Sequence, residues 1–165
     1  DWPAERYTEL CRGLADAYDP TILLIGGPSA QERAVAEHVL KHSRSAPIST
    51  LADDVRKMMW TVAGCDLVIS PDSGPLHLAH AMGVPVVGLY GFTSPARFGP
   101  YQRFRDLVID AYHDADEEVT PTRQEARGGR MKRIAVEQVL ERVELAVDRY
   151  GILSNHDHAT AEEAE

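Results

Sequence analysis

The feature that most constrains the fold is a series of short apolar runs, each of which stops at glycine, proline or a small polar residue. Three such runs stand out, at residues 21–25, 66–70 and 86–90. Continuous apolar runs of this length are typical of strands that are buried on both faces of a parallel sheet. The glycine and proline residues that follow mark the turns where these strands end. A fourth, weaker strand is predicted at residues 107–109.

Segments with the apolar spacing of helices alternate with these strands. Helices are predicted at residues 3–18, 31–40, 51–63, 72–82 and 133–150. Thr50 and Asp53 have the spacing of a capping box, which places the start of the third helix at Leu51. Strands that alternate with helices form a doubly wound parallel sheet, so the predicted fold class is α/β. In such sheets ligands bind at the carboxyl ends of the strands.

The length of the chain allows one domain. With 165 residues, 44% of them hydrophobic, it can bury a sizeable core but is too short for two full domains. We expect this domain to span residues 1–150 and to be followed by a disordered acidic tail at 151–165, where apolar periodicity is absent. Because the chain opens at Asp1 without a signal pattern, we expect it to be an excised part of a longer protein.

Charge and cysteine content exclude several classes of protein. A net charge of −9 argues against a nucleic-acid partner, because tracking phosphates needs surplus lysine and arginine. Cys11 and Cys65 lie in apolar patterns and are typical of reduced core cysteines in the cytoplasm. His156 and His158 are the one histidine pair considered as metal ligands, and we expect no metal site.

The strongest chemical signal is Asp72-Ser73-Gly74, between a predicted strand and a predicted helix. Free N–H groups at a helix start bind anions, and Gly74 would let a ligand approach the backbone. The Ser73 hydroxyl could cap the helix or bind a phosphate oxygen, and His77 lies one turn further on with its side chain directed back toward the helix start. Since Asp72 would repel phosphate, the expected ligand also carries hydroxyl groups, as a sugar does.

Two other interpretations of this segment stay open. In the first, Asp72 or Ser73 only caps the helix and His77 is a half-buried ring without a ligand. In the second, Ser73 and His77 belong to a serine hydrolase, although Pro71 stands where the nucleophile elbow needs glycine.

Larger blocks of the sequence resemble a known family. Residues 72–79, 83–91 and 93–95 resemble the donor-binding half of glycosyltransferase family 9, the ADP-heptose lipopolysaccharide heptosyltransferases. Trp2-Pro3 and residues 24–28 and 131–139 occur in the order of the family, so the resemblance runs from residue 2 to about residue 150.

This resemblance implies a Rossmann-like, nucleotide-sugar-binding half of a GT-B fold. The implied reaction is an inverting, metal-independent transfer of a heptose, or a related sugar, to a lipopolysaccharide-core-type acceptor. The donor would be an ADP-heptose-like nucleotide sugar, with no cofactor. No catalytic residue is expected in this chain, because the general base and the acceptor site belong to an N-terminal half that would be its partner. The implied location is the cytoplasm, with any peripheral membrane association at the inner face of the inner membrane.

The resemblance also assigns roles to residues around the predicted strand ends. Asp72 would hold sugar hydroxyls, Ser73, Gly74 and His77 would hold the diphosphate, and Thr93 would line the same cleft.

Further contacts implied by the family are less complete in this sequence. The family carboxylate that binds the ribose corresponds to Gln31 or Glu32 in this sequence, and counting positions without a gap favours Gln31. Ser49 and Thr50 would lie near the base. The phosphate-binding lysine of the family lies just before Trp2-Pro3, where this chain begins.

Two further classes compete with the glycosyltransferase interpretation. One is a non-catalytic nucleotide-binding or interaction domain of flavodoxin-like shape. The other is a nucleotide-sugar epimerase, which shares the aspartate-serine-glycine turn but continues with glycine and an acid, whereas this chain continues Pro75-Leu76-His77.

Overall fold

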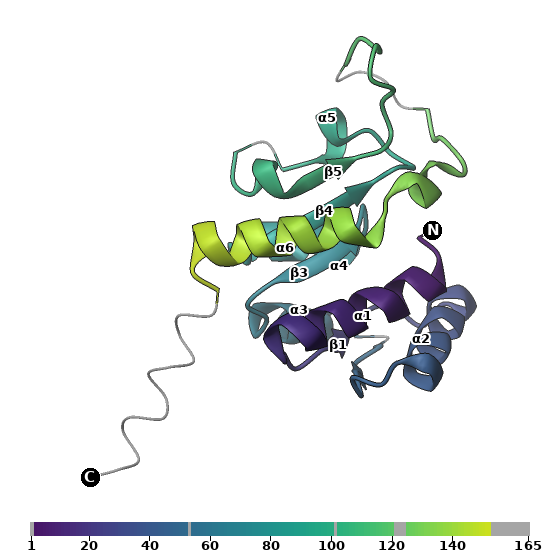
Figure 1. Ribbon diagram of the computed structural model, residues 1–165, viewed down its shortest axis with the longest axis vertical. Helices are drawn as coiled ribbons and strands as arrows, with labels where there is room; N and C mark the ends of the chain where they lie inside the picture. Colours follow the sequence, from purple (N-terminus) through teal and green to yellow (C-terminus); the bar gives the residue numbers. More distant parts are fainter. Residues whose placement is uncertain (1, 53, 101, 121–124, 153–165) are drawn as a thin grey trace.

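The computed structural model describes residues 2–52, 54–100, 102–120 and 125–152, and helices and strands alternate along them (Figure 1). In chain order the elements are α1 (Ala4–Tyr18), β1 (Leu23–Leu24), α2 (Ala30–His42), β2 (Ile48–Ser49), α3 (Val55–Ala63), β3 (Val68–Pro71), α4 (Gly74–Met82), β4 (Val86–Tyr90), α5 (Pro95–Phe98), η1 (Arg105–Leu107), β5 (Val108–Asp110), η2 (Arg130–Arg133) and α6 (Val136–Tyr150). The expected tail at 153–165, with His156 and His158, lies outside the described residues.

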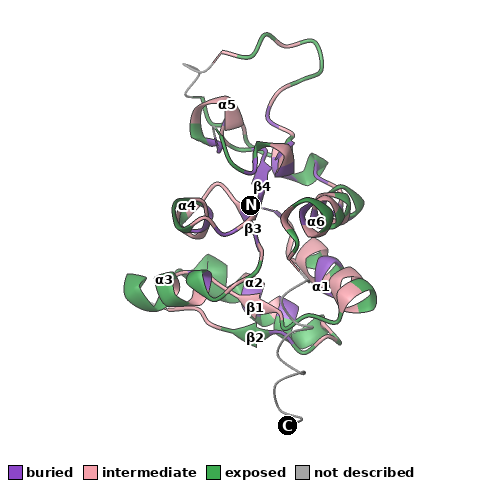
Figure 2. Ribbon diagram, turned by 90° about the vertical axis from the view of Figure 1, so that its left-hand side faces the viewer, coloured by how far each residue is buried: buried purple, intermediate pink, exposed green. Residues whose placement is uncertain are grey.

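All strand pairs in the described chain are parallel, which confirms the predicted α/β class. β3, β4 and β5 form one sheet in that order, with Tyr90 opposite Asp110, and β1 and β2 form another, with Leu23 opposite Ile48. In Figure 2, β1 and β2 lie below β3, in line with the strands of the larger sheet but apart from them. A continuous sheet was expected, but it is divided between β1 and β3. The ladder hydrogen bonds of β1 go to β2. A hollow of about 1120 Å³ is lined by residues of both β1 and β3.

Helices cover both faces of these strands, as a doubly wound fold requires. In Figure 2, α3 and α4 lie on one side of the strands and α1 and α6 lie on the other. Helix α1 also packs against α2, and α3 packs against α4.

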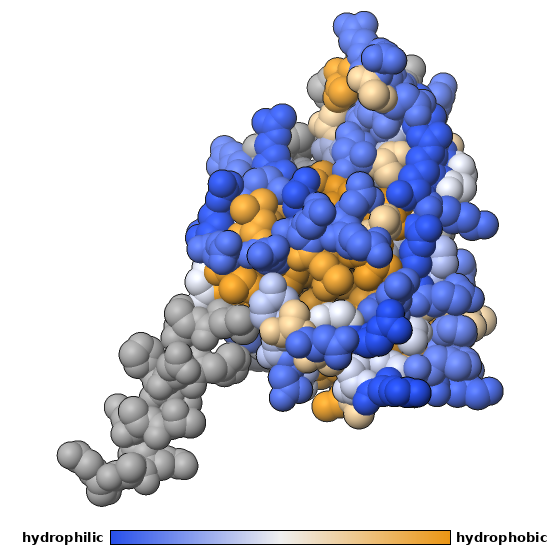
Figure 3. All heavy atoms as spheres, in the orientation of Figure 1, coloured by the Kyte–Doolittle hydropathy of each residue, from blue (hydrophilic) through white to orange (hydrophobic). Residues whose placement is uncertain are grey.

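The core is centred on β4, all of whose residues are buried. Trp2, 1% exposed, joins the beginning of the chain to the approach to α6, because its indole Nε1 donates a hydrogen bond of 2.9 Å to the carbonyl of Ile134. The ring of Tyr7 stands edge-on to Trp2 at 4.8 Å between centroids, and burial raises the pKa of Tyr7 to about 12. Apolar side chains of this core reach the surface in the seam between α1 and α6 (Figure 3).

The prediction for the start of α3 was wrong. The helix begins at Val55, capped by Asp54, whose carboxylate accepts a hydrogen bond of 2.8 Å from the N–H of Arg56. Thr50 does not cap it, because its N–H and its hydroxyl both bond the carbonyl of Leu24, at 2.9 and 3.0 Å. Residues 48–49 form a strand that sequence analysis did not predict.

The polar segment after β5 is anchored at several points among the described residues. Tyr112 is fully buried and its hydroxyl donates a hydrogen bond of 2.7 Å to the carbonyl of Glu125. Arg127 pairs with Glu117, and both side chains are mostly shielded from solvent. The N–H of Arg127 donates a hydrogen bond of 2.9 Å to the carbonyl of Phe92, which holds this part of the segment against the turn after β4.

Candidate nucleotide-sugar site

The turns that follow β1, β3 and β4 border one end of the hollow between β1 and β3, which we call the strand-end hollow and which continues along both strands past Leu10, Val39 and Val143. Its lining includes five of the predicted site residues: Gln31, Glu32, Asp72, Ser73 and Thr93. They come from segments that are up to 62 positions apart in the sequence, and the parallel strands bring them to the same edge. Gly74 and His77 follow directly in the first turn of α4.

Asp72 connects the two sides of this edge. Its Oδ1 lies 2.8 Å from Nε2 of His77 in α4, and its Oδ2 accepts a hydrogen bond of 2.6 Å from the hydroxyl of Thr93, after β4. The carboxylate is 14% exposed and the imidazole is 52% exposed. A carboxylate offers about four lone-pair sites, so Asp72 can still accept hydrogen bonds from a ligand.

The Ser73 side chain does not cap α4, which corrects one of the two roles considered for it. Its hydroxyl lies 2.8 Å from that of Ser70, and Ser70 donates its own proton to the carbonyl of Pro71 at 2.9 Å. Ser73 is therefore the donor in the serine pair. Because the Ser73 side chain makes no cap hydrogen bond, it leaves the first N–H groups of α4 available to an anion.

Gly74 leaves the beginning of α4 open to a ligand. A Cβ built on Gly74 meets nothing within 4 Å, and the residue does not have a positive φ. The glycine is therefore not required by the packing or the backbone conformation of the described residues.

The Gly26-Gly27 turn after β1 is covered by Glu32. Its Oε1 accepts a hydrogen bond of 3.1 Å from the N–H of Gly27, and its Oε2 accepts one of 2.6 Å from the hydroxyl of Ser29. Ser29 in turn accepts from the N–H of Glu32 at 3.2 Å, which completes a capping box for α2. The hydrogen bond from Ser29, followed by that from Gly27, lowers the pKa of Glu32. Gln31 lines the same hollow.

Replacing Glu32 with Gln should make the acid-induced loss of stability smaller. A carboxyl group with a lowered pKa contributes stability above its unfolded value, here 4.5, and this contribution is lost as the pH falls through the folded value. Urea unfolding of the wild type and Glu32→Gln should therefore differ more at about pH 6 than at about pH 3. The exposed Glu37→Gln in the same helix is the control. A difference that is the same at both pH values would contradict the assignment.

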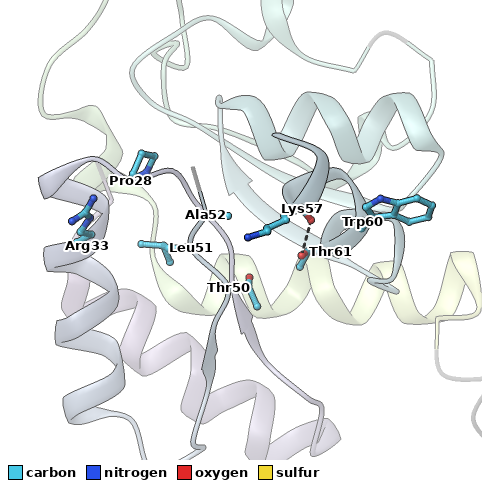
Figure 4. Close-up of a pocket in the computed structure, with 8 residues that line it drawn as sticks. All are labelled: Pro28, Arg33, Thr50, Leu51, Ala52, Lys57, Trp60 and Thr61. Carbon is cyan, nitrogen blue, oxygen red and sulfur yellow. Dashed lines mark hydrogen bonds between the residues drawn. The ribbon is translucent and has the colours of Figure 1, made fainter. Parts of the chain in front are cut away.

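A smaller hollow of about 660 Å³ adjoins the strand-end hollow and shares Leu51 with it. Figure 4 shows Arg33 of α2 and Lys57 of α3 on opposite sides of it, with Leu51 and Ala52 between them. Thr50 lines this hollow, whereas Ser49 is exposed on β2 and lines neither. The structure thus brings Thr50 near the site, but not Ser49.

The serine hydrolase interpretation is not supported by this geometry. A nucleophile needs a hydrogen bond to its base, yet Ser73 bonds Ser70 and His77 bonds Asp72.

Within the described residues, no three His, Cys, Asp or Glu side chains are grouped so that they could hold a metal ion.

Sequence analysis missed Ser70, Ser94 and His113, which border the site residues. Ser70 and Ser94 are the buried polar residues of the described core, at 6% and 2% exposure. Ser70 ends a predicted apolar strand, and this polar residue in a buried position is the signal that could have identified it.

The fold and the site define a class: a parallel α/β domain that presents an uncapped helix start, a carboxylate and hydroxyl groups at the carboxyl ends of its strands. The comparison with protein families agrees with this class, since glycosyltransferase family 9 (heptosyltransferase) matches residues 1–126. The chain belongs to this family, which confirms the resemblance seen in its sequence.

Individual relatives support the same assignment. The chain is 30% identical to lipopolysaccharide core heptosyltransferase OpsX of Haemophilus influenzae, over 69% of this chain and 33% of that protein. It is 34% identical to lipopolysaccharide heptosyltransferase 1 of Escherichia coli K12, over 61% of this chain and 30% of that protein. The crystal structure of a family 9 glycosyltransferase from Veillonella parvula matches with a TM-score of 0.70 and 26% identity, covering 87% of this chain and 41% of the other. The chain thus spans about a third of the length of these two curated relatives.

Proposed function

We propose that residues 1–150 are the donor-binding half of a glycosyltransferase that moves a heptose, or a related sugar, from a nucleotide diphosphate sugar to a lipopolysaccharide-core-type acceptor. The observation that carries this proposal is the position of Asp72, which bonds both His77 and Thr93 beside the uncapped start of α4. The site offers donors for a diphosphate and an acceptor for hydroxyl groups, and a nucleotide sugar presents both.

The donor would lie along the carboxyl edge of the strands. Its diphosphate would accept hydrogen bonds from the N–H groups at the beginning of α4 beside Gly74, and would lie next to Ser73 and His77, whose own protons bond Ser70 and Asp72. Its sugar hydroxyls would donate to Asp72, with Thr93 alongside. Gln31 or Glu32 would contact the ribose, and Thr50 is proposed near the base because it lines the adjoining hollow.

The reaction would proceed with inversion and without a metal ion, with its general base in a separate acceptor-binding half. The relatives are about three times as long as the matched region, which leaves room for such a half in them.

No helix among the described residues is long and apolar enough to cross a bilayer. We propose that the protein acts in the cytoplasm, with any membrane association peripheral and at the inner face of the inner membrane.

Nucleotide binding tests the first part of this proposal. Calorimetry with ADP, UDP and GDP on the full-length protein should favour ADP. A preference for UDP would keep the donor-binding role but overturn the ADP-heptose assignment. If none of the three binds, residues 1–150 are an interaction domain and the proposal fails.

Sugar transfer tests the second part. The full-length protein should transfer labelled heptose from ADP-heptose to a lipid-core acceptor with inversion, equally well with and without a chelator. Residues 1–165 alone should transfer none, because the general base is proposed to lie in the acceptor-binding half. Transfer by residues 1–165 alone would place the base in this chain, and loss of transfer with chelator would overturn the metal-free mechanism.

Gly74→Ala should weaken ADP binding while leaving the fold intact. The added methyl group would stand where we propose that the diphosphate approaches the backbone, so we expect an affinity loss of about 1–3 kcal/mol by calorimetry. The free energy of unfolding should change by less than about 1 kcal/mol, because nothing lies within 4 Å of the new Cβ. Unchanged ADP affinity would move the diphosphate away from α4.

A further inference from the structure

Besides Asp72, a second set of side chains contacts the turn that contains Thr93. Ser94 is 2% exposed, and its hydroxyl lies 3.3 Å from Nε2 of His113. Nδ1 of the same ring lies 2.7 Å from Oδ2 of Asp110, and the His113 side chain is 5% exposed. A chain of polar groups therefore leads from Asp110, whose side chain is 36% exposed at the end of β5, through the shielded His113 ring to the residue next to Thr93.

The pairing of β4 with β5 creates this arrangement. Tyr90 is opposite Asp110, and the N–H of Ala111 donates a hydrogen bond of 2.7 Å to the carbonyl of Tyr90, so the two strands end at the same level. Oδ1 of Asp110 accepts from the N–H groups of Tyr112 and His113, at 3.0 and 3.1 Å. This turn, closed by an aspartate side chain, brings the His113 ring to Ser94.

The roles of donor and acceptor along the chain are defined by Asp110. A carboxylate only accepts, so Nδ1 of His113 is the donor to it, and in that tautomer Nε2 accepts from the Ser94 hydroxyl. The order serine, histidine, aspartate also occurs in hydrolytic triads. Here the serine is enclosed, so no substrate reaches its hydroxyl and the three groups can only hold one another.

We propose that Ser94, His113 and Asp110 are positioning residues that fix the turn after β4. They hold Thr93 so that its hydroxyl keeps Oδ2 of Asp72 in place, while Oδ1 bonds His77. The orientation of Asp72 toward the sugar of the donor then depends on residues from two strand ends. The ligand in this proposal rests on the proposed function, but the geometry of the turn does not.

Hydrogen exchange tests the geometry without any ligand. In the full-length protein, His113→Gln and Ser94→Ala should both speed amide exchange in residues 91–94 and 70–73 at least about fivefold. His42→Gln, on the exposed surface of α2, is the control and should change neither segment. If His113→Gln fails to fold, Ser94→Ala still tests whether these side chains fix the turn, because it removes only one hydroxyl group. Unchanged exchange in Ser94→Ala would overturn the proposal.

Affinity for two probes tests the effect on the site. Thr93→Val and Ser94→Ala should each weaken binding of ADP-heptose by about 5- to 20-fold, while binding of ADP alone changes less than about twofold. Because both act through one contact, the double variant should be no weaker than the worse single variant. Additive losses, or equal losses for both probes, would overturn the positioning role.

The two proposals fail in distinguishable ways. If the wild type binds ADP-heptose no better than ADP, the sugar role proposed for Asp72 fails, and hydrogen exchange alone then decides whether Ser94 and His113 fix the turn. Labelling of Ser94 by a fluorophosphonate would show an accessible nucleophile and overturn the inference that it only positions.

Discussion

Trp2→Ala should lower the free energy of unfolding by about 3–5 kcal/mol, the usual cost of truncating a large buried aromatic side chain. The indole is 1% exposed, packs edge-on against Tyr7 and donates a hydrogen bond to the carbonyl of Ile134. The variant would lose the packing of the ring and one of the two donors to that carbonyl, the other being the guanidinium of Arg6. Urea unfolding followed by circular dichroism measures the change.

The chain offers a matched control for this substitution. Trp60, the other tryptophan of the sequence, is 79% exposed on α3, so Trp60→Ala should change the free energy of unfolding by less than about 0.5 kcal/mol. If the two variants are equally stable, Trp2 does not join the beginning of the chain to the approach to α6.

Burial explains which strands could be predicted from the sequence. Val86–Tyr90 is buried at every residue, so its apolar run coincides with the strand. Residues 48 and 49 are both exposed and form no apolar run, because β2 depends on its backbone pairing with β1. The local pattern around Thr50 fits a capping box in the same misleading way. Its hydroxyl instead donates a hydrogen bond to the carbonyl of Leu24, which is 26 positions away.

The candidate site divides in a similar way. Asp72, Ser73, Gly74 and His77 could be predicted because they are neighbours in one strand-turn-helix segment. His113 could not, since its relation to Ser94 arises from the register of β4 and β5 and from a turn that Asp110 closes. Contacts that depend on strand register have no local sequence pattern, and the structure is needed to find them.

Asp72→Asn should reduce sugar transfer by the full-length protein by about 100-fold or more. We propose that the carboxylate accepts hydrogen bonds from the donor's sugar, and hydrogen bonds to a charged group contribute about 1.5–3 kcal/mol each. The amide has the same shape but one acceptor oxygen instead of two, so it cannot serve His77, Thr93 and the sugar together.

The fold should tolerate this substitution, which separates the loss of transfer from loss of structure. The charge is removed without changing the volume of the side chain, so the unfolding midpoint should stay close to that of Asp148→Asn, a substitution on the exposed surface of α6. Steady-state kinetics with ADP-heptose would show the loss, while calorimetry with ADP would show affinity within about threefold of the wild type. Equal transfer by Asp72→Asn and Asp148→Asn would mean that the carboxylate only supports α4 and the turn after β4. The sugar would then have to bind elsewhere along the strand-end hollow.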